Sequence, residues 1–392
     1  MRILRPLDLN CTQNTMPLSH KISTRRDFMT RMSAGLGALS LSPFLPRTLA
    51  AASTAKSGKL GIALVGLGNY AGKQLAPALE QASDCYLAGI VTGTPEKEGI
   101  WAEKYGIKKG NIYNYRNFDR IASNPEIDIV YVVLPNSMHA EYTIRAANAG
   151  KHVICEKPMA LNAAEAQTMI DACKRNSVQL SIGYRLHFDP NTLELMRLAS
   201  EKPYGAVKYV QSEAAFSMGN NLKAWRLNRA LAGGGAMMDM GVYSIQAARY
   251  CTGEEPIAVR AQEHKTDRVK FKEVDETITW QMEFPSGAYS NSTTSYNLRT
   301  NRIYVSYERG AASLEPATSY TGIKGAIFKG RTVEKTLDVQ AINQQQRQMD
   351  GFSRGVRSGT PSIVPGEEGL ADMKVIDAIY RSIANGGRRE LI

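Results

Sequence analysis

The sequence is poor in cysteine and has no long apolar run. Its 392 residues include five cysteines, scattered without a C-x-x-C pair or a Cys/His cluster at zinc spacing. This pattern argues against a disulfide scaffold and a cysteine-built zinc site, and no metal is expected. No stretch of eighteen or more uninterrupted apolar residues occurs, which argues against a membrane-spanning helix in the mature chain.

The composition also argues against disorder and nucleic-acid binding. Hydrophobic residues make up 43% of the chain and charged residues 22%, close to globular averages, and the length suggests two domains. The formal net charge is +11, but residues 1–52 hold seven Lys and Arg against two Asp. The remaining positive charge is dispersed, without a basic run interleaved with aromatics, so no nucleic-acid partner is expected.

Residues 1–52 have the features of an export signal. The segment S-T-R-R-D-F-M at 23–29 precedes an apolar stretch at 32–44 and T-L-A-A-A at 48–52. A cationic start, an apolar middle and a small-residue cleavage site typify secretory signals, and the paired arginines resemble a twin-arginine signal. We therefore expect the twin-arginine export machinery as a partner and a periplasmic mature protein without membrane contact. The alternative is a flexible basic N-terminus.

Residues 60–65 form an apolar run that ends in G-L-G-N-Y-A-G. A buried strand followed by G-x-G-x-x-A and a helix, here expected over 73–81, is the dinucleotide-binding pattern. Gly66 would allow the tight turn and Gly68 the close approach of a pyrophosphate. Asn69 and Tyr70 complete the predicted cofactor loop.

Alternating strands and helices predict a parallel doubly wound sheet. Further strands are expected at 86–91, 128–134, 152–155 and 178–182, and helices at 140–149 and 163–174. The second strand is followed by V-T-G-T-P-E-K, not by the acidic residue that usually binds the ribose of NAD. Thr92 and Lys97 would tolerate a 2′-phosphate, so NADP is favoured over NAD. Alternatively, Lys97 is a solvated lysine at a helix start.

The next two strands also end in polar segments. Pro135, Asn136 and His139 lie in L-P-N-S-M-H, and Glu156 and Lys157 lie in C-E-K-P. Both segments fall at the sheet edge where a nicotinamide would lie, so cofactor contacts are expected there. The chain continues with G-Y-R-L-H-F-D-P at 183–190, A-W-R at 224–226 and G-G-G-A-M-M-D-M-G-V-Y at 233–243.

In this order, the motifs resemble those of the Gfo/Idh/MocA oxidoreductases, closest to the glucose-fructose oxidoreductase branch and related exported aldose oxidoreductases. The resemblance runs from about residue 60 to the end of the chain, including P-G-E-E-G at 365–369. It implies an α/β plus α+β fold: a Rossmann NADP-binding domain and a second domain with an open, mostly antiparallel sheet. The alternating patterns at 207–215, 257–262, 277–284 and 302–307 agree with such a sheet.

The domain boundaries follow from the same resemblance. The Rossmann domain is expected at 53–183, and a substrate and oligomerisation domain at 184–365. A C-terminal segment at 366–392, helical over about 367–383, is expected to pack back on the first domain. A homo-oligomer, dimer or tetramer, is implied by analogy with the family.

The resemblance also assigns the chemistry. Tyr243 matches the family's catalytic tyrosine and is the candidate general acid/base, where many relatives carry histidine. A phenol is a poor base at neutral pH without a nearby cation, which Lys157 would provide. Asp239, four residues before Tyr243, would bind sugar hydroxyls or orient the other two.

Other residues are expected around the sugar and the cofactor. Tyr184 and Arg185 would face the sugar, whereas Trp225 and Arg226 would contact cofactor or substrate. For Tyr184 and Trp225, a role as packed aromatic residues explains the sequence equally well. His139 is expected to cap a helix or contact the ribose side.

The expected activity is exported, NADP-dependent oxidation of an aldose at C1 to the aldonolactone. The hydride would pass through tightly bound NADP(H) to a second sugar. Alternatives are an NAD-dependent glycosidase of the same fold, a plain NAD(P)-dependent sugar dehydrogenase, and a cofactor-binding sensor without catalysis.

The founding branch of the family has a long arm before the first strand, which wraps the cofactor and a partner subunit. Here only about ten residues separate the predicted cleavage site from residue 60, so permanent retention of NADP and a tetramer held by such an arm do not carry over from that branch.

Overall fold

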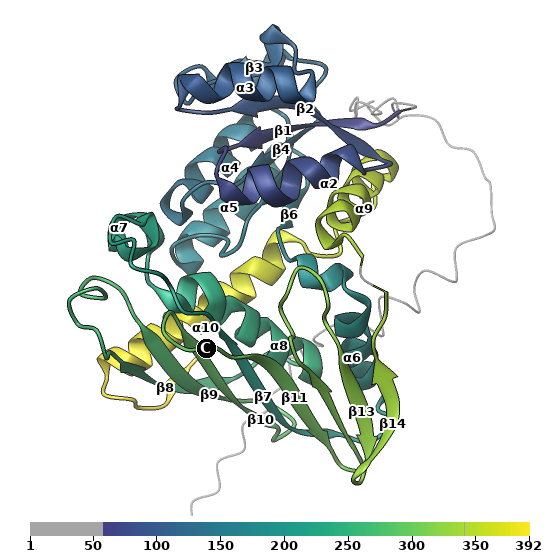
Figure 1. The fold of residues 1–392 in the computed structure, drawn as a ribbon, viewed down its shortest axis with the longest axis vertical. Helices are drawn as coiled ribbons and strands as arrows, with labels where there is room; N and C mark the ends of the chain where they lie inside the picture. The colour runs from purple at the N-terminus through teal and green to yellow at the C-terminus, as the bar shows by residue number, and fades with distance from the viewer. Residues whose placement is uncertain (1–57, 341) are drawn as a thin grey trace, which may run out of the picture. The chain divides into compact units, whose positions relative to one another are not determined.

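Two sheets organise the computed structural model of the protein, which describes residues 58–340 and 342–392 (Figure 1). One sheet is parallel and the other mostly antiparallel, which confirms the predicted fold class. The predicted signal segment, 1–52, lies outside the described residues.

The first sheet has the strand order β3-β2-β1-β4-β5-β6. In its centre, Ile62 and Leu64 face one hydrophobic cluster while Ala63 and Val65 face another. Burial on both faces explains why this strand reads as a continuous apolar run. The strands are β1 (Leu60–Val65), β2 (Cys85–Val91), β3 (Ile112–Tyr113), β4 (Ile129–Val132), β5 (His152–Cys155) and β6 (Leu180–Ile182).

Helices cover both faces of the first sheet. The cluster around Ala63 includes side chains of α4 (His139–Asn148) and α5 (Ala163–Arg175). The cluster around Ile62 includes side chains of α2 (Ala76–Glu80) and α3 (Pro95–Tyr105). Short helical segments connect them: η1 (Ala71–Leu75), η2 (Lys109–Asn111), η3 (Phe118–Ser123) and η4 (Asn136–Met138).

The second sheet has the order β14-β13-β12-β11-β7-β10-β9-β8-β15, in which only β7 and β10 pair in parallel. In β9, Ile278, Trp280 and Met282 are buried and the residues between them are half-buried, so one face is covered by helices. The strands are β7 (Val207–Ala215), β8 (Ala258–His264), β9 (Thr277–Glu283), β10 (Tyr289–Ser295), β11 (Asn301–Tyr307), β12 (Ala311–Leu314), β13 (Gly325–Lys329), β14 (Thr332–Leu337) and β15 (Glu390–Leu391).

Several shorter elements lead into this sheet and cover it. Helix α8 contacts β7 and β10, and α6 packs on α8. The elements are η5 (Arg185–Phe188), α6 (Pro190–Glu201), η6 (Trp225–Leu227), α7 (Arg229–Ala232), η7 (Met237–Gly241) and α8 (Val242–Thr252).

The last two helices return to the first domain. In α9 (Gln344–Ser358), Met349 and Phe352 join the cluster around Ile62, and Asp350 accepts the backbone N–H of Asp84 at 2.7 Å. Helix α10 (Gly366–Ala384) begins one residue before the predicted range and ends one residue after it. Its Asp377 accepts the N–H of Ala163, at the start of α5, at 2.9 Å.

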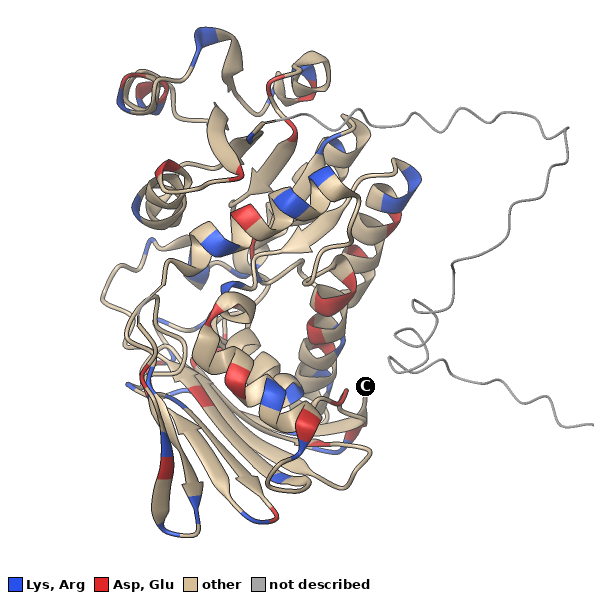
Figure 2. Cartoon of the chain, turned by 90° about the vertical axis from the view of Figure 1, so that its right-hand side faces the viewer, with Lys and Arg blue, Asp and Glu red and all other residues tan. Residues whose placement is uncertain are grey.

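Lys and Arg residues are mixed with Asp and Glu residues along the helices and strands that the structure describes (Figure 2). None of the helices described is both long and apolar enough to cross a membrane. Among residues 58–340 and 342–392, His, Cys, Asp and Glu form no group of three that would suit a metal ion.

Candidate active site

The two glycines of the loop after β1 differ in the space around them: Gly66 is packed against backbone, whereas Gly68 faces open space. Gly66 has φ +97°, and a Cβ there would lie 2.6 Å from the carbonyl oxygen of Val133, so only glycine fits without strain. A Cβ on Gly68 would meet no atom within 4 Å, and Gly68 and Asn69 are both exposed. The open side of the loop therefore has the space that a dinucleotide pyrophosphate requires.

Thr92 and Lys97 lie at the neighbouring strand end and brace the backbone there. Lys97 Nζ donates to the carbonyl of Leu67 at 2.8 Å, which ties α3 to the glycine loop. Thr92 is 3% exposed, and its hydroxyl accepts the N–H of Thr94 at 3.1 Å. The Lys97 ammonium is therefore held beside the glycine loop, against the residue that precedes Gly68.

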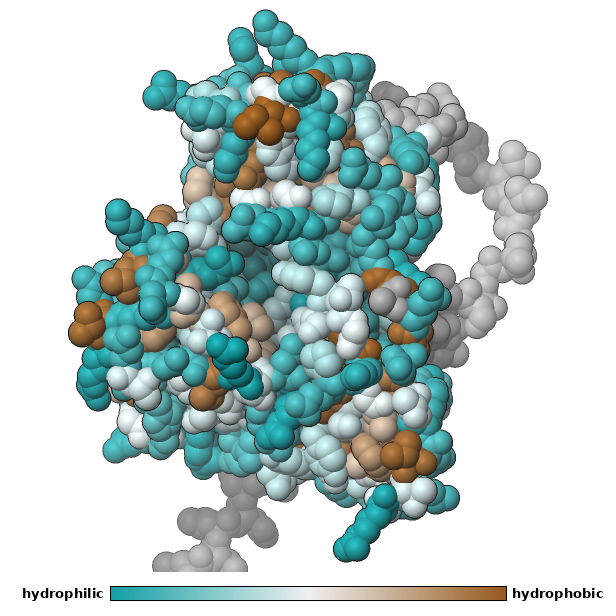
Figure 3. Space-filling view, viewed as in Figure 1, coloured by the Kyte–Doolittle hydropathy of each residue, from teal (hydrophilic) through white to brown (hydrophobic). Residues whose placement is uncertain are grey.

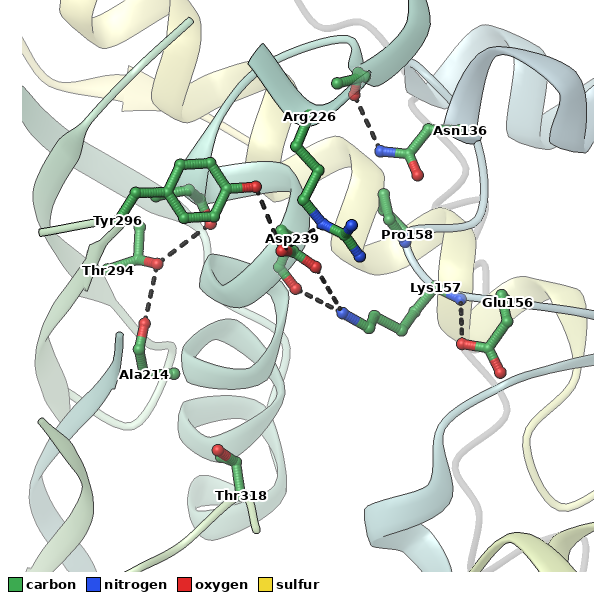
Figure 4. Close-up of polar contacts among 12 residues, drawn as sticks. Asn136, Glu156, Lys157, Pro158, Ala214, Arg226, Asp239, Thr294, Tyr296 and Thr318 are labelled. Atoms are coloured by element: carbon green, nitrogen blue, oxygen red, sulfur yellow. Dashed lines mark hydrogen bonds and ion pairs between the residues drawn. The ribbon is translucent and has the colours of Figure 1, made fainter. Parts of the chain in front are cut away.

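Lys157, Arg226 and Tyr296 converge on Asp239 (Figure 4). Lys157 Nζ lies 3.2 Å from Oδ1 of Asp239 and also donates to its backbone carbonyl at 2.5 Å. Oδ2 of Asp239 accepts from Arg226 Nε at 2.8 Å and from the Tyr296 hydroxyl at 3.2 Å. Lys157 belongs to the first domain and Arg226 to the second, and the Asp239 carboxylate connects them.

Electrostatics favours the ionised forms of this group. Burial raises the pKa of Asp239, but the charges of Lys157 and Arg226 outweigh that effect and hold the pKa below its ordinary value. Burial lowers the pKa of Lys157, but the facing Tyr243 and Asp239 outweigh it and raise the pKa. Asp239 and Lys157 therefore form a charged pair at neutral pH.

The glycine run before Asp239 allows its helical segment to start against Asp275. The Asp275 carboxylate accepts the N–H of Gly235 at 2.7 Å and that of Met237 at 2.8 Å. A Cβ on Gly235 would lie 1.9 Å from the Asp275 carbonyl oxygen, and one on Gly234 would lie 2.0 Å from the Tyr380 hydroxyl. Larger residues would push the segment off this cradle and displace Asp239.

Tyr243 lies in the first turn of α8, beside Lys157, and is 7% exposed. Lys157 Nζ is 4.7 Å from the centroid of its ring, and the guanidinium carbon of Arg185 is 5.1 Å from the same point. The structure therefore brings together Lys157, Asp239 and Tyr243, the three residues predicted to be catalytic. Arg185 adds a second cation beside the phenol.

Arg185 and Tyr184 are more enclosed than a sugar-facing turn would suggest. Arg185 is 3% exposed and donates to Gln344 Oε1 and to the carbonyls of Thr318 and Ser319. Tyr184 is 1% exposed and faces Asp372 of α10. The structure places Arg185 next to the site through Tyr243 and places Tyr184 in the packed core.

The predicted cofactor contacts after β4 divide into two groups. Asn136 Nδ2 donates to the carbonyl of Ala232 at 2.9 Å, which links this turn, led by the half-buried Pro135, to α7. His139 is 1% exposed, and its ring nitrogens lie 2.8 and 2.9 Å from the carbonyls of Pro158 and Leu134. Burial lowers the pKa of His139, and a neutral imidazole in this place donates to only one of the two carbonyls.

Glu156 points into the protein. Its Oε1 accepts from the Tyr131 hydroxyl at 2.6 Å, and that hydroxyl accepts from Gln348 Nε2 at 2.8 Å. Glu156 is 7% exposed, and burial raises its pKa. A Cβ on Gly183 would lie 2.6 Å from Oε1, which accounts for the glycine of the G-Y-R motif.

Trp225 stands at the outer edge of the site. It is half-buried, and the guanidinium carbon of Arg226 lies 4.6 Å from the centroid of its ring. Figure 3 shows a recess in the face below the first domain, with mostly hydrophilic residues around it. This arrangement suits a polar ligand.

Three residues of the site were absent from our sequence predictions: Asp275, Tyr296 and Tyr320. The first two act through contacts with Gly235 and Asp239, which are 40 and 57 residues away in the chain. The Tyr320 ring centroid lies 4.5 Å from the guanidinium carbon of Arg185, and Tyr320 itself is on the connection between β12 and β13, strands that were not predicted. No motif marks these positions.

The chain is similar to known oxidoreductases in sequence and in structure. Two family models match: "Oxidoreductase family, NAD-binding Rossmann fold" over residues 60–184 and "GFO/IDH/MocA C-terminal domain" over 192–313. The structure of an aldose-aldose oxidoreductase from Caulobacter crescentus, complexed with glycerol, is 45% identical with a TM-score of 0.82. That match covers 85% of this chain and 100% of the other.

Two archaeal enzymes are also similar in sequence. A D-xylose 1-dehydrogenase [NADP(+)] of Haloarcula marismortui is 29% identical, over 84% of this chain and 92% of its own. A D-xylose 1-dehydrogenase (NADP(+)) 2 of Haloferax volcanii is 30% identical, over 85% of this chain and 99% of its own.

Proposed function

The chain belongs to the Gfo/Idh/MocA oxidoreductase family, and from this premise we propose that it is an NADP-dependent sugar oxidoreductase that oxidises an aldose at C1. The observation that carries the proposal is the convergence of Lys157, Asp239 and Tyr243 at the ends of β5 and α8. This site faces the cofactor side of a Rossmann sheet, where such enzymes bind their substrates.

Each residue has a role that its contacts support. The nicotinamide ring of the bound cofactor supplies the hydride acceptor. Tyr243 removes the proton of the anomeric hydroxyl, and Lys157 stabilises the negative charge that develops on that oxygen. Asp239 positions the Lys157 ammonium through its 3.2 Å contact.

NADP is the proposed cofactor. Residues 92–95, directly after β2, are Thr, Gly, Thr and Pro, so no carboxylate lies at the strand end to repel a 2′-phosphate. Lys97 supplies positive charge two residues later. The two archaeal relatives named NADP(+)-dependent support the same choice.

We further propose that the hydride passes from the bound cofactor to a second sugar. The similarity to an aldose-aldose oxidoreductase supports a reaction between two sugars. The predicted twin-arginine signal supports export to the periplasm with the cofactor already bound, since that signal exports folded proteins. Recycling on one cofactor would then make an external supply unnecessary.

The deciding experiment follows the cofactor in purified protein without residues 1–52. We expect NADP to copurify, to be reduced when an aldose such as glucose or xylose is added, and to be reoxidised by a second sugar. Reduction that requires added NADP at every turnover would indicate a plain dehydrogenase, as the xylose dehydrogenase relatives suggest. No reduction, with release of an aglycone from a glycoside, would instead indicate a glycosidase. Molar mass in solution tests the expected dimer or tetramer.

A further inference from the structure

Tyr320 reaches the active site from the connection between β12 and β13. Arg185 donates to the backbone carbonyls of Thr318 and Ser319, the two residues before it. The guanidinium carbon of Arg185 also lies 4.5 Å from the centroid of the Tyr320 ring. A residue that is 3% exposed therefore fixes both the backbone before Tyr320 and its side chain.

The same Arg185 places Tyr320 next to the reaction centre. Its guanidinium carbon is 5.1 Å from the Tyr243 ring centroid, so the two rings share one cation. The Tyr320 ring also stacks on Tyr70 of the glycine loop, with centroids 6.0 Å apart and an interplanar angle of 29°. Tyr320 thus lies where the second domain meets both the proposed acid/base and the cofactor loop.

Among these rings, Tyr320 has the most accessible surface. It is 43% exposed, whereas Tyr243 is 7% exposed and Tyr70 is half-buried. A tyrosine offers an apolar ring and a hydroxyl that can donate or accept a hydrogen bond. A pyranose matches both, because its C–H groups form apolar patches between its hydroxyl groups.

We propose that Tyr320 is a substrate-binding residue that forms a wall of the sugar subsite beside Tyr243. Its ring packs against the sugar's C–H groups, and its hydroxyl bonds a sugar hydroxyl away from C1. The side chain therefore decides how well different aldoses are held, and hydride transfer itself does not depend on it. This inference rests on the proposed oxidation of an aldose, but not on transfer to a second sugar.

The test uses the first half-reaction alone, with saturating added NADP and a panel of pentoses and hexoses. The variants are Tyr320→Ala and Tyr320→Phe, with Tyr304→Ala as a matched control. Tyr304 is 40% exposed on β11, between the buried Ile303 and Val305. Its side chain therefore points to the face of the sheet that is not covered by helices. Cofactor affinity and melting temperature are measured for every variant.

We expect Tyr320→Ala to raise KM for the preferred aldose by about tenfold and to change the ranking of the sugars, with kcat and NADP affinity nearly unchanged. Tyr320→Phe should raise KM less than Tyr320→Ala does, because it keeps the ring and loses only the hydroxyl group. KM values equal to those of the Tyr304→Ala control would overturn the inference. A joint loss of kcat, NADP affinity and melting temperature would also overturn it, since it would indicate a structural role. Wild-type protein that oxidises no sugar would instead refute the proposed function and, with it, this role.

Discussion

Removal of the Tyr243 hydroxyl tests the proposed acid/base chemistry directly. In Tyr243→Phe the ring keeps its place near Lys157 and Arg185, whose contacts are to the ring at 4.7 and 5.1 Å. Only the group that exchanges the proton is lost. General acid–base catalysis contributes about 10²- to 10⁴-fold, which corresponds to about 3–5 kcal/mol in the barrier.

The structure also limits the side effects of this change. Loss of one hydroxyl group from a tyrosine costs about 0.5–1.5 kcal/mol of folding stability when its hydrogen bond is lost. NADP affinity should stay at the wild-type value, because the glycine loop is untouched. The expected pattern is a large fall in kcat with small changes in melting temperature and cofactor binding.

The assay follows reduced nicotinamide with a saturating aldose, and Tyr250→Phe provides the control. Tyr250 lies on the same helix as Tyr243, lines a small cavity together with it and has a buried hydroxyl. We expect the control variant to react at nearly the wild-type rate. If Tyr243→Phe also keeps its rate within a factor of a few, Tyr243 is not the proton acceptor and the assignment fails.

Three further predictions concern the cofactor loop, the charged pair and a buried carboxyl. Gly68→Ala should weaken NADP binding and leave the melting temperature unchanged. Gly66→Ala should lower the melting temperature, because a Cβ on Gly66, unlike one on Gly68, would lie 2.6 Å from a backbone oxygen. Equal melting temperatures for the two variants would contradict this prediction. Asp239→Asn should reduce kcat/KM by about 10²- to 10³-fold, since it removes the charge that faces Lys157; an unchanged kcat/KM would show that the charge is dispensable. Burial raises the pKa of Asp372 to about 6 and outweighs the opposing charge of Arg249, whose guanidinium lies 2.6 Å away. The protonated carboxyl therefore contributes to stability below about pH 4, and this contribution is lost as pH rises through 6. The unfolding free energy of wild type relative to that of Asp372→Asn should therefore fall over that range, by roughly 3 kcal/mol at most. The same relative value in urea titrations at pH 4 and pH 7 would show that the pKa of Asp372 is not raised.

Local patterns were sufficient to predict five of the six strands of the first sheet, and only the short β3 was not predicted. Its central strand is apolar on both faces, and the glycines that follow it stand where the backbone turns sharply, at φ +97°, or faces open space. The strand ends that carry Asn136 and Lys157 were located by the same reasoning. The exact ends differed: β6 begins at Leu180, whereas residue 178 was expected, because Val178 still belongs to the turn after α5.

Long-range contacts explain what the sequence did not predict. The strand pattern of β13 and β14 is mixed, and most of β14 is exposed, so no alternation marks these strands. Asp275 resembles any other acidic residue until it meets the glycine run at 2.7 Å. His139 and Glu156 were expected at the cofactor, and only the folded chain reveals their bonds to Leu134, Pro158 and Tyr131.

The return of α9 to the first domain affects the order in which the protein can be completed during synthesis. Met349 and Phe352 share a core with β1, and Asp350 accepts the backbone N–H of Asp84, 266 residues earlier in the chain. During synthesis this face of the first sheet is therefore covered only by α2 and α3 until α9 emerges from the ribosome. Completion of the first domain is therefore a late event, because α9 is made after every strand of the second sheet except β15.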